Sequence, residues 1–148
     1  MKELKALDTL EETQIREAVF KFFASCPLIP DNVSRQYGDV KNDSIAVFAQ
    51  QGSGKYTKQY VSGSYEAQFP FFLRYRSQPT TIKNRLSAES LLDNIAKWMC
   101  GQDVFPILTD GRKIEKIESG TVYMVDKAED GTIDYQVSMN LKYFKKGR

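Results

Sequence analysis

Histidine is absent from this chain of 148 residues, and cysteine occurs only twice. Without histidine, the chain lacks the commonest general base and the commonest metal ligand at neutral pH. This excludes Ser-His-Asp and Cys-His catalysis within one chain, and it excludes zinc sites built on histidine. The two cysteines, Cys26 and Cys100, are too few for a four-thiolate zinc site. We expect reduced thiols, and a disulfide between them stays open until their geometry is known.

Long apolar runs are also missing. No run approaches the roughly 20 apolar residues of a membrane-spanning helix, so we expect no membrane span, and the charged start from Met1 to Lys5 is unlike a secretory signal. The formal net charge is only +2, from 21 Lys and Arg against 19 Asp and Glu. The length suits a single domain over residues 1–148, and 41% hydrophobic residues allow a core without a metal or disulfide.

The motifs that could indicate a cofactor or a reaction fail on inspection. A phosphate-binding loop at Gly54-Lys55 would need glycine at position 49, where the chain has Ala49, and a helix after it. A calcium loop over residues 126–137 fails because Ala128 and Val137 stand where oxygen ligands are required. We therefore expect no catalytic residue, no cofactor-binding residue and no metal ligand. An enzyme would have to use carboxylate, lysine or tyrosine chemistry.

The first predicted element is an amphipathic helix. It begins at a capping box made by Asp8 with Glu11 or by Thr9 with Glu12, and Pro27 ends it. Its apolar residues recur at helical spacing; they are Ile15, Ala18, Val19, Phe22 and Phe23. Residues 27–43 then predict a long loop, and loops of this length are often functional.

A second helix follows Pro79, with Thr80 or Thr81 as its cap or Ser87 as a later start, and Gly101 ends it. Its apolar face is marked by a stripe at helical spacing; the stripe contains Ala88, Leu91, Leu92, Ile95 and Met99. Trp98 lies beside this stripe, and we favour core packing over an interface anchor for it.

Five strands are predicted around the second helix. Residues 44–50 and 55–62 form a hairpin through Gly52–Gly54, and Gly63 leads into a strand over residues 65–76. Pro70 cannot donate a ladder hydrogen bond, so that strand is an edge or carries a bulge. After the second helix, residues 113–125, interrupted near Ser119-Gly120, pair with residues 133–143 through the Asp130-Gly131 turn.

The resulting order is α-β-β-β-α-β-β, an α+β domain with two helices packed on a largely antiparallel sheet. Two predicted strands of about 11–12 residues exceed the usual length and leave edges that must be covered, which indicates oligomerisation. We expect the turn near residue 52 and the loop over residues 27–43 to contact a neighbouring subunit, because loops often carry recognition. The candidate contact residues are Gln51, Gly52, Ser53, Gly54, Lys55, Asp31, Arg35 and Tyr37.

A weak single-stranded nucleic-acid-binding module is an alternative, without sequence-specific recognition. Residues 44–77 carry four cations against Glu66 alone, and three tyrosines among them could act as stacking platforms. These cations are Lys55, Lys58, Arg74 and Arg76, and the tyrosines are Tyr56, Tyr60 and Tyr65. A nucleic-acid-binding domain normally shows a denser basic patch.

Several segments resemble the tail-terminator and minor capsid (tail completion) proteins of long-tailed bacteriophages. The most similar run is residues 60–71, YVSGSYEAQFPF, which continues into Leu73-Arg74-Tyr75-Arg76. The helix ending LLDNIAKWM at residues 91–99 and the C-terminal strand ending LKYFKK at residues 141–146 are similar too. The resemblance spans most of residues 1–146, and the order of elements matches the tail-terminator fold.

The resemblance implies a structural role and no enzymatic activity. Proteins of this family cap the head-proximal end of the tail tube as a ring, typically a hexamer, and join it to the neck. The implied partners are further copies of the chain, the tail tube protein and a neck or head-completion protein. The implied location is the virion, after assembly in the cytoplasm of the bacterial host. The family has no catalytic residues to transfer, and another head–tail connector protein remains the alternative.

Overall fold

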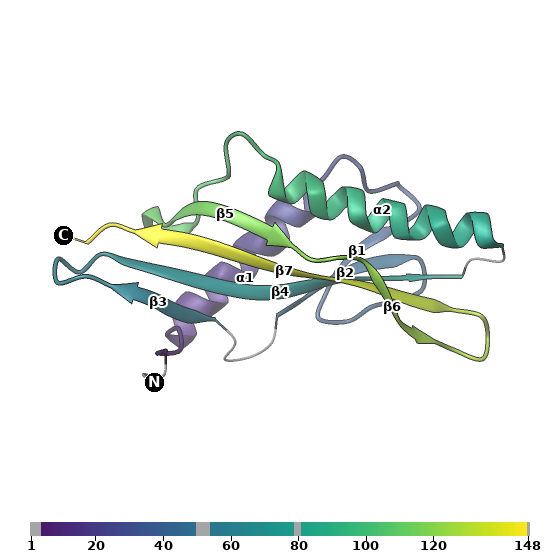
Figure 1. Ribbon diagram of the computed structural model, residues 1–148, viewed down its shortest axis with the longest axis horizontal. Coiled ribbons are helices and arrows are strands. Elements are labelled where there is room, and N and C mark those ends of the chain that lie inside the picture. The colour runs from purple at the N-terminus through teal and green to yellow at the C-terminus, as the bar shows by residue number, and fades with distance from the viewer. Residues whose placement is uncertain (1–3, 50–53, 79–80, 148) are drawn as a thin grey trace.

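Two helices pack on one face of a seven-stranded sheet in the computed structural model, which describes residues 4–49, 54–78 and 81–147 (Figure 1). The helices are α1 (Thr9–Ala24) and α2 (Ile82–Cys100), and the short helix η1 (Thr109–Gly111) follows α2. The strands in chain order are β1 (Ser34–Tyr37), β2 (Ser44–Ala49), β3 (Lys55–Gln59), β4 (Tyr65–Ser77), β5 (Lys113–Ser119), β6 (Tyr123–Lys127) and β7 (Ile133–Lys145).

Strands β4 and β7 form the centre of the sheet. Each has 13 residues, and they pair antiparallel from Tyr65 opposite Lys145 to Ser77 opposite Ile133. Alternate residues of both strands are buried against the helices, while the residues between them face away. This burial follows the alternation of apolar and polar residues in the sequence of both strands. The buried members are Ala67, Phe69, Phe71, Leu73, Tyr75, Tyr135, Val137, Met139, Leu141 and Tyr143.

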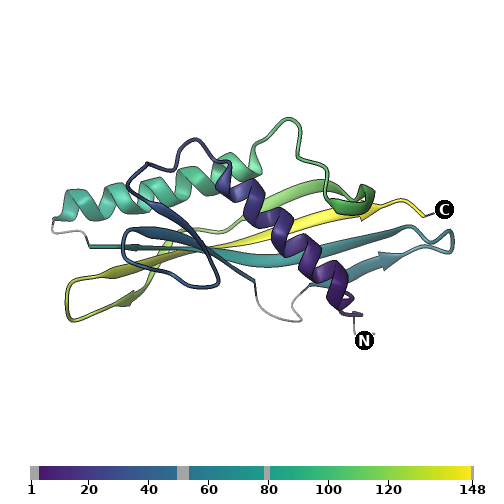
Figure 2. The same cartoon turned by 180° about the vertical axis from the view of Figure 1, so that it is seen from behind.

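Both helices cover the buried face of the sheet. Helix α1 crosses the sheet diagonally in Figure 2, and Ile15, Val19 and Phe23 from its predicted stripe are buried. The helices touch through Phe22 and Trp98, whose ring centroids lie 5.2 Å apart. Trp98 therefore packs against the core, as expected.

The two helix starts differ in their capping. Thr81 caps α2, and its Oγ1 accepts a hydrogen bond from the Asn84 backbone N–H at 3.1 Å, which confirms one of the two predicted caps. At α1 the N-cap residue is Asp8, whose side chain makes no capping hydrogen bond. The predicted capping box is wrong, because the Glu11 side chain points into the protein and accepts hydrogen bonds from three tyrosine hydroxyls.

The predicted hairpin between residues 44–50 and 55–62 is wrong. Strand β2 pairs with residues 71–76 of β4, and β3 pairs with residues 65–68 of the same strand. The two short strands therefore lie end to end along one side of β4, because β4 is long enough to pair with both. The hairpin that forms joins β3 to β4 through Gly63, whose φ of 91° favours glycine.

Pro70 lies inside the sheet, so the expectation of an edge strand or a bulge there is also wrong. The pairing of β4 with β7 runs through Pro70 opposite Asn140 without a register shift. On the other side of β4, pairing with β3 stops at Gln68 and pairing with β2 starts at Phe71. Proline is placed at the junction between these two partners, where it disturbs neither ladder.

Two further strands complete the sheet. β1 lies within the predicted loop over residues 27–43 and pairs parallel with β2. The predicted strand over residues 113–125 is two strands, β5 and β6, which both pair with β7 and separate at the expected interruption near Gly120. The observed order is α-β-β-β-β-α-β-β-β, so the predicted α+β class is confirmed with more strands than expected.

Candidate functional site

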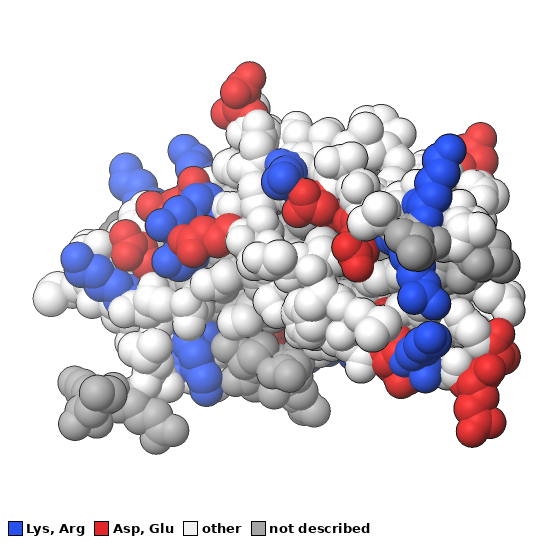
Figure 3. Space-filling model, turned by 45° about the vertical axis from the view of Figure 1, so that its right-hand side comes forward, with Lys and Arg blue, Asp and Glu red and all other residues white. Residues whose placement is uncertain are grey.

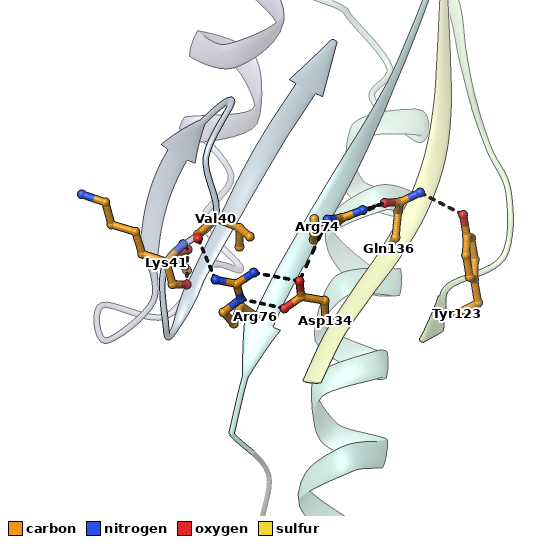
Figure 4. A network of polar contacts seen from close by, with 8 residues as sticks. Val40, Lys41, Arg74, Arg76, Tyr123, Asp134 and Gln136 are labelled. Carbon is orange, nitrogen blue, oxygen red and sulfur yellow. Dashed lines mark hydrogen bonds and ion pairs between the residues drawn. The ribbon is translucent and has the colours of Figure 1, made fainter. Parts of the chain in front are cut away.

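The sheet face turned away from the helices presents a polar network that joins three strands. We call this surface the open face; in the half of the sheet beside β6 it comprises Ser44, Ala46, Phe48, Phe72, Arg74, Arg76, Tyr123, Asp126, Asp134, Gln136 and Ser138. Arg76 and Asp134 stand opposite each other on β4 and β7 (Figure 4). The Arg76 guanidinium donates from Nε to Oδ1 of Asp134 at 2.8 Å and from Nη2 to Oδ2 at 3.0 Å. It also donates to the backbone oxygen of Val40 at 3.1 Å.

The network continues across the sheet through Arg74. Arg74 donates from Nη2 and Nε to Oε1 of Gln136 at 2.7 and 3.2 Å. The Gln136 amide in turn donates to the Tyr123 hydroxyl at 2.8 Å, which ties β6 to β7 (Figure 4). Apolar and polar residues alternate in the sequence of β7, which places Asp134 and Gln136 away from the core, but their partners on β4 depend on the register of two strands far apart in sequence.

An aromatic pair lies next to this network. The rings of Phe48 and Phe72 are stacked with centroids 5.0 Å apart and planes 7° from parallel. The Arg74 guanidinium carbon lies 5.5 Å from each ring centroid, within cation–π range. Both rings are half-buried although no helix covers this face. Phe72 is an apolar residue on the otherwise polar face of β4, and its contact with Phe48 accounts for its place there.

The charges on this part of the open face compensate one another. Two arginines, Arg74 and Arg76, stand beside two aspartates, Asp126 and Asp134, and only 3% of Asp134 is exposed. The hydrogen bond with Asp134 raises the pKa of Arg76 above its ordinary value. A surface of this kind, polar and apolar but without excess charge, suits contact with another protein more than attraction of an anion.

A second network lies on the helix side, where Glu11 of α1 is buried beneath three tyrosines. Glu11 accepts hydrogen bonds from the hydroxyls of Tyr56 at 3.1 Å, Tyr65 at 2.8 Å and Tyr143 at 2.5 Å. The guanidinium of Arg112 lies 3.5 Å from Glu11 Oε1. Burial is the main cause that raises the pKa of Tyr56 and Tyr65 to about 12, and it raises that of Tyr143 further. The cluster fastens α1 to β3, β4 and β7.

The predicted contact turn is only partly described. Gln51, Gly52 and Ser53 lie outside the described residues. Gly54 and Lys55 pair with the chain's own N-terminal segment: the Leu7 N–H donates to the Gly54 oxygen at 3.1 Å, and Ala6 bridges to Lys55. A Cβ at Gly54 would lie 2.6 Å from Leu7. This end of the turn therefore packs against the chain's own N-terminal segment.

The contact residues predicted in the 27–43 loop fall in different environments. Asp31 is exposed in a turn before β1. Arg35 and Tyr37 belong to β1 and point to the helix side, where Arg35 Nη2 donates to the Cys26 oxygen at 3.4 Å. The Tyr37 ring meets Phe20 of α1 edge to face, with centroids 6.1 Å apart. Arg35 and Tyr37 lie close together on β1. Among the described contacts, none joins Asp31 to either of them.

The cysteines are both free. Cys26 is buried and Cys100 is half-buried, and burial raises the pKa of each thiol. The open question of a disulfide is thus answered in favour of two protonated thiols. Across the three described ranges, no group of three or more Cys, Asp and Glu side chains is placed to hold a metal ion. Neither α1 nor α2 has an apolar stretch long enough to cross a lipid bilayer.

The stacking platforms of the nucleic-acid alternative are mostly absent from the surface. Tyr56 and Tyr65 point their hydroxyls at Glu11, and their rings contact each other edge to face at 5.1 Å. Tyr60 is 38% exposed, with Lys58 Nζ 5.0 Å from its ring centroid. On the side of the molecule drawn in Figure 3, cations and carboxylates are interspersed, and neither sign forms a continuous patch.

Comparison with known proteins identifies a shared fold. No family model matches the chain, and no curated protein sequence matches it. Among solved structures, it is similar to a chain in the virion of a native gene transfer agent (GTA) particle, with a TM-score of 0.64 and 8% sequence identity. The superposition covers 93% of this chain and 100% of the other. The chain therefore has the same fold, over nearly its whole length, as a component of a phage-like particle.

Proposed function

We propose that this chain is a structural protein of a phage-like virion. The observation that carries the proposal is the full-length match in fold to a chain of the gene transfer agent particle. Fold alone does not specify function, so the surfaces of this chain must also suit assembly. The open face with its compensated charges and its Phe48–Phe72 pair offers such a surface.

Within this class we propose the role of a tail terminator, a ring that caps the head-proximal end of the tail tube and meets the neck. The resemblance of residues 60–71, 91–99 and 141–146 to that family supports this role. The chain acts by binding and positioning other proteins, and we propose that it is not an enzyme. The partners are further copies of the chain, the tube protein and a neck or head-completion protein.

Deletion of the gene in the strain that produces the particle tests this role. A tube built by repeated head-to-tail contacts has no intrinsic length. Its polymerisation therefore stops only when another protein caps the growing end. Electron microscopy of the lysate is expected to show tubes of variable length separated from filled heads. Expression of the intact chain from a plasmid restores particles of uniform length.

The same experiment separates the terminator from another head–tail connector. Loss of a connector leaves tails of uniform, normal length that are not attached to heads, and this result would replace the terminator with the connector role. Complete particles with normal tails in the deletion strain would contradict any structural role at the tail. Light scattering on the purified chain measures whether it forms a ring before it meets the tube.

A further inference from the structure

In one half of the sheet the two edge strands, β1 and β6, lie at the same level, that is, at the same height along the direction of the strands. In this half the order is β1-β2-β4-β7-β6. The register runs across it from Gln36 to Ala46, Arg74, Gln136 and Tyr123. Within the described residues, β1 pairs only with β2, and β6 pairs only with β7. Two edges at one level can be joined by a rotation from one copy of the chain to the next, without a shift along the strands.

The directions of the two edge strands are compatible with such pairing. β1 is parallel to β2, and the pairs β2–β4, β4–β7 and β7–β6 are antiparallel. Strand β6 therefore runs opposite to β1. A rotation about an axis along the strands preserves their directions, so β6 of one copy would meet β1 of the next in the antiparallel arrangement, which is slightly the more stable one.

An apolar groove lies beside β1 on the helix side. It has a volume of about 280 Å³ and is lined by Thr13, Arg16, Glu17 and Phe20 of α1 and by Tyr37 of β1. Tyr37 is 41% exposed, so its ring is available to a neighbouring side chain. An edge strand next to an apolar groove is the arrangement used by proteins that bind an added strand, where the main chain pairs and a side chain fills the groove.

Strand β6 carries an apolar side chain that matches this groove. Met124 and Lys127 stand opposite the buried Tyr135 and Ile133, so they lie on the helix side of the sheet. Met124 is 53% exposed and can enter the groove beside Phe20 and Tyr37, whose rings contact each other and form part of its wall.

Strand β5, the other outer strand beside β7, is protected against pairing. Its exposed residues are mostly charged, a common device against unwanted strand addition; they are Lys113, Glu115, Lys116, Glu118 and Ser119. Strand β6 instead exposes Tyr123 and Met124, at 47% and 53%. The contrast marks β6, rather than β5, as the edge available for another chain.

We propose that β6 of one copy of this chain adds to β1 of the next, with Met124 seated in the groove lined by Phe20 and Tyr37. The contact is head-to-tail, so it uses two different edges of each copy and closes into a ring when the rotation permits. This inference rests on the proposed assembly of the chain into a ring and identifies the contact that builds it.

Cross-linking through introduced cysteines tests the contact. Tyr37→Cys and Met124→Cys are combined in one chain, and the protein is treated with a short bismaleimide that spans opposite and diagonal cross-strand pairs. The matched control combines Tyr37→Cys with Glu115→Cys, which places the second thiol on β5. The unaltered chain controls for Cys26 and Cys100. The reaction is run on the purified chain and on particles assembled from the variant in the deletion strain.

A ladder of covalent oligomers is expected from the double variant and not from its control. Mixing chains that carry only Tyr37→Cys with chains that carry only Met124→Cys should stop at the covalent dimer, because each copy then has one reactive edge. Oligomers or particles that form without the 37–124 cross-link would overturn the pairing of β1 with β6. A cross-link from either cysteine to another protein would overturn it as well. Both results would leave the proposed ring itself intact. Tails of normal length in the deletion strain would instead overturn the proposed function.

Discussion

Arg76 and Asp134 form a bidentate pair across β4 and β7, with donor–acceptor distances of 2.8 and 3.0 Å. The two residues are 58 positions apart in the chain and stand opposite each other at one end of the 13-residue strand pairing. Asp134 is nearly inaccessible, while about a third of the Arg76 side chain reaches solvent. The pair therefore links the end of β4 to the β6–β7 hairpin on a face without helices.

Replacement of Asp134 by alanine should destabilise the fold. Arg76 then loses both of its carboxylate contacts, and because solvent still reaches its guanidinium, we expect a loss of about 1–2 kcal/mol in the free energy of unfolding. Urea denaturation measures the loss. Asp126→Ala, an exposed aspartate on the neighbouring strand, is the matched control and should change stability little. Equal effects of the two substitutions would contradict the structural importance of the pair.

Glu11→Ala should be more damaging than any single tyrosine change in the helix-side cluster. It leaves three tyrosine hydroxyls and Arg112 without their shared acceptor, which we expect to cost about 3 kcal/mol. Tyr143→Phe removes one hydrogen bond and should cost about 1 kcal/mol. Glu17→Ala, on the exposed side of the same helix, is the control. The prediction fails if Glu11→Ala and Glu17→Ala unfold at the same urea concentration.

Alkaline pH should weaken the fold through the same cluster. The pKa of Tyr56 and of Tyr65 rises from 10.0 to about 12 on folding, mainly through burial, so the folded state favours the protonated phenol. Their contribution is fully present below pH 10.0 and is lost as the pH rises towards 12. Thermal unfolding at a series of pH values measures this loss. Tyr56→Phe should lower the melting temperature at neutral pH but reduce its further fall in alkali; an unchanged fall would contradict the assignment.

Phe72→Ala should reduce assembly more than it reduces stability. Loss of the stacked pair with Phe48 is expected to cost about 1–2 kcal/mol, since the ring is only half-buried. The substitution also removes an apolar contact from the open face. The control is Ile114→Ala, a half-buried position packed against the core on the helix side. Particle yield in the complemented deletion strain is the measurement, and equal yields from the two variants would show that the open face makes no contact in the particle.

Local sequence patterns determined the long elements of this protein. Alternation of apolar and polar residues defined the two faces of β4 and β7, because successive side chains of a strand point to opposite sides. Helical spacing defined the buried stripe of α1, and Thr81 and Gly101 marked the ends of α2. The absence of histidine and of a four-cysteine set restricted the possible site chemistry before any coordinates were considered.

The pairing of strands was decided by tertiary structure. Glycines near residue 52 favoured a local hairpin, yet β2 and β3 both pair with β4, because its 13 residues offer two consecutive stretches of backbone hydrogen-bonding groups. Strand β1 has four residues and a largely polar sequence, so no periodicity marks it, and it exists because β2 supplies a partner.

The functional surfaces depend on that pairing as well. The sequence by itself determined that Arg76 and Asp134 face away from the core, whereas only the register of β4 against β7 places them opposite each other. Glu11 follows the same rule: its position suited a helix cap, but the hydroxyls of three tyrosines from three strands converge on it and hold it inside. Contacts between residues distant in the chain require the closed fold, because local patterns carry no information about which strand becomes a neighbour.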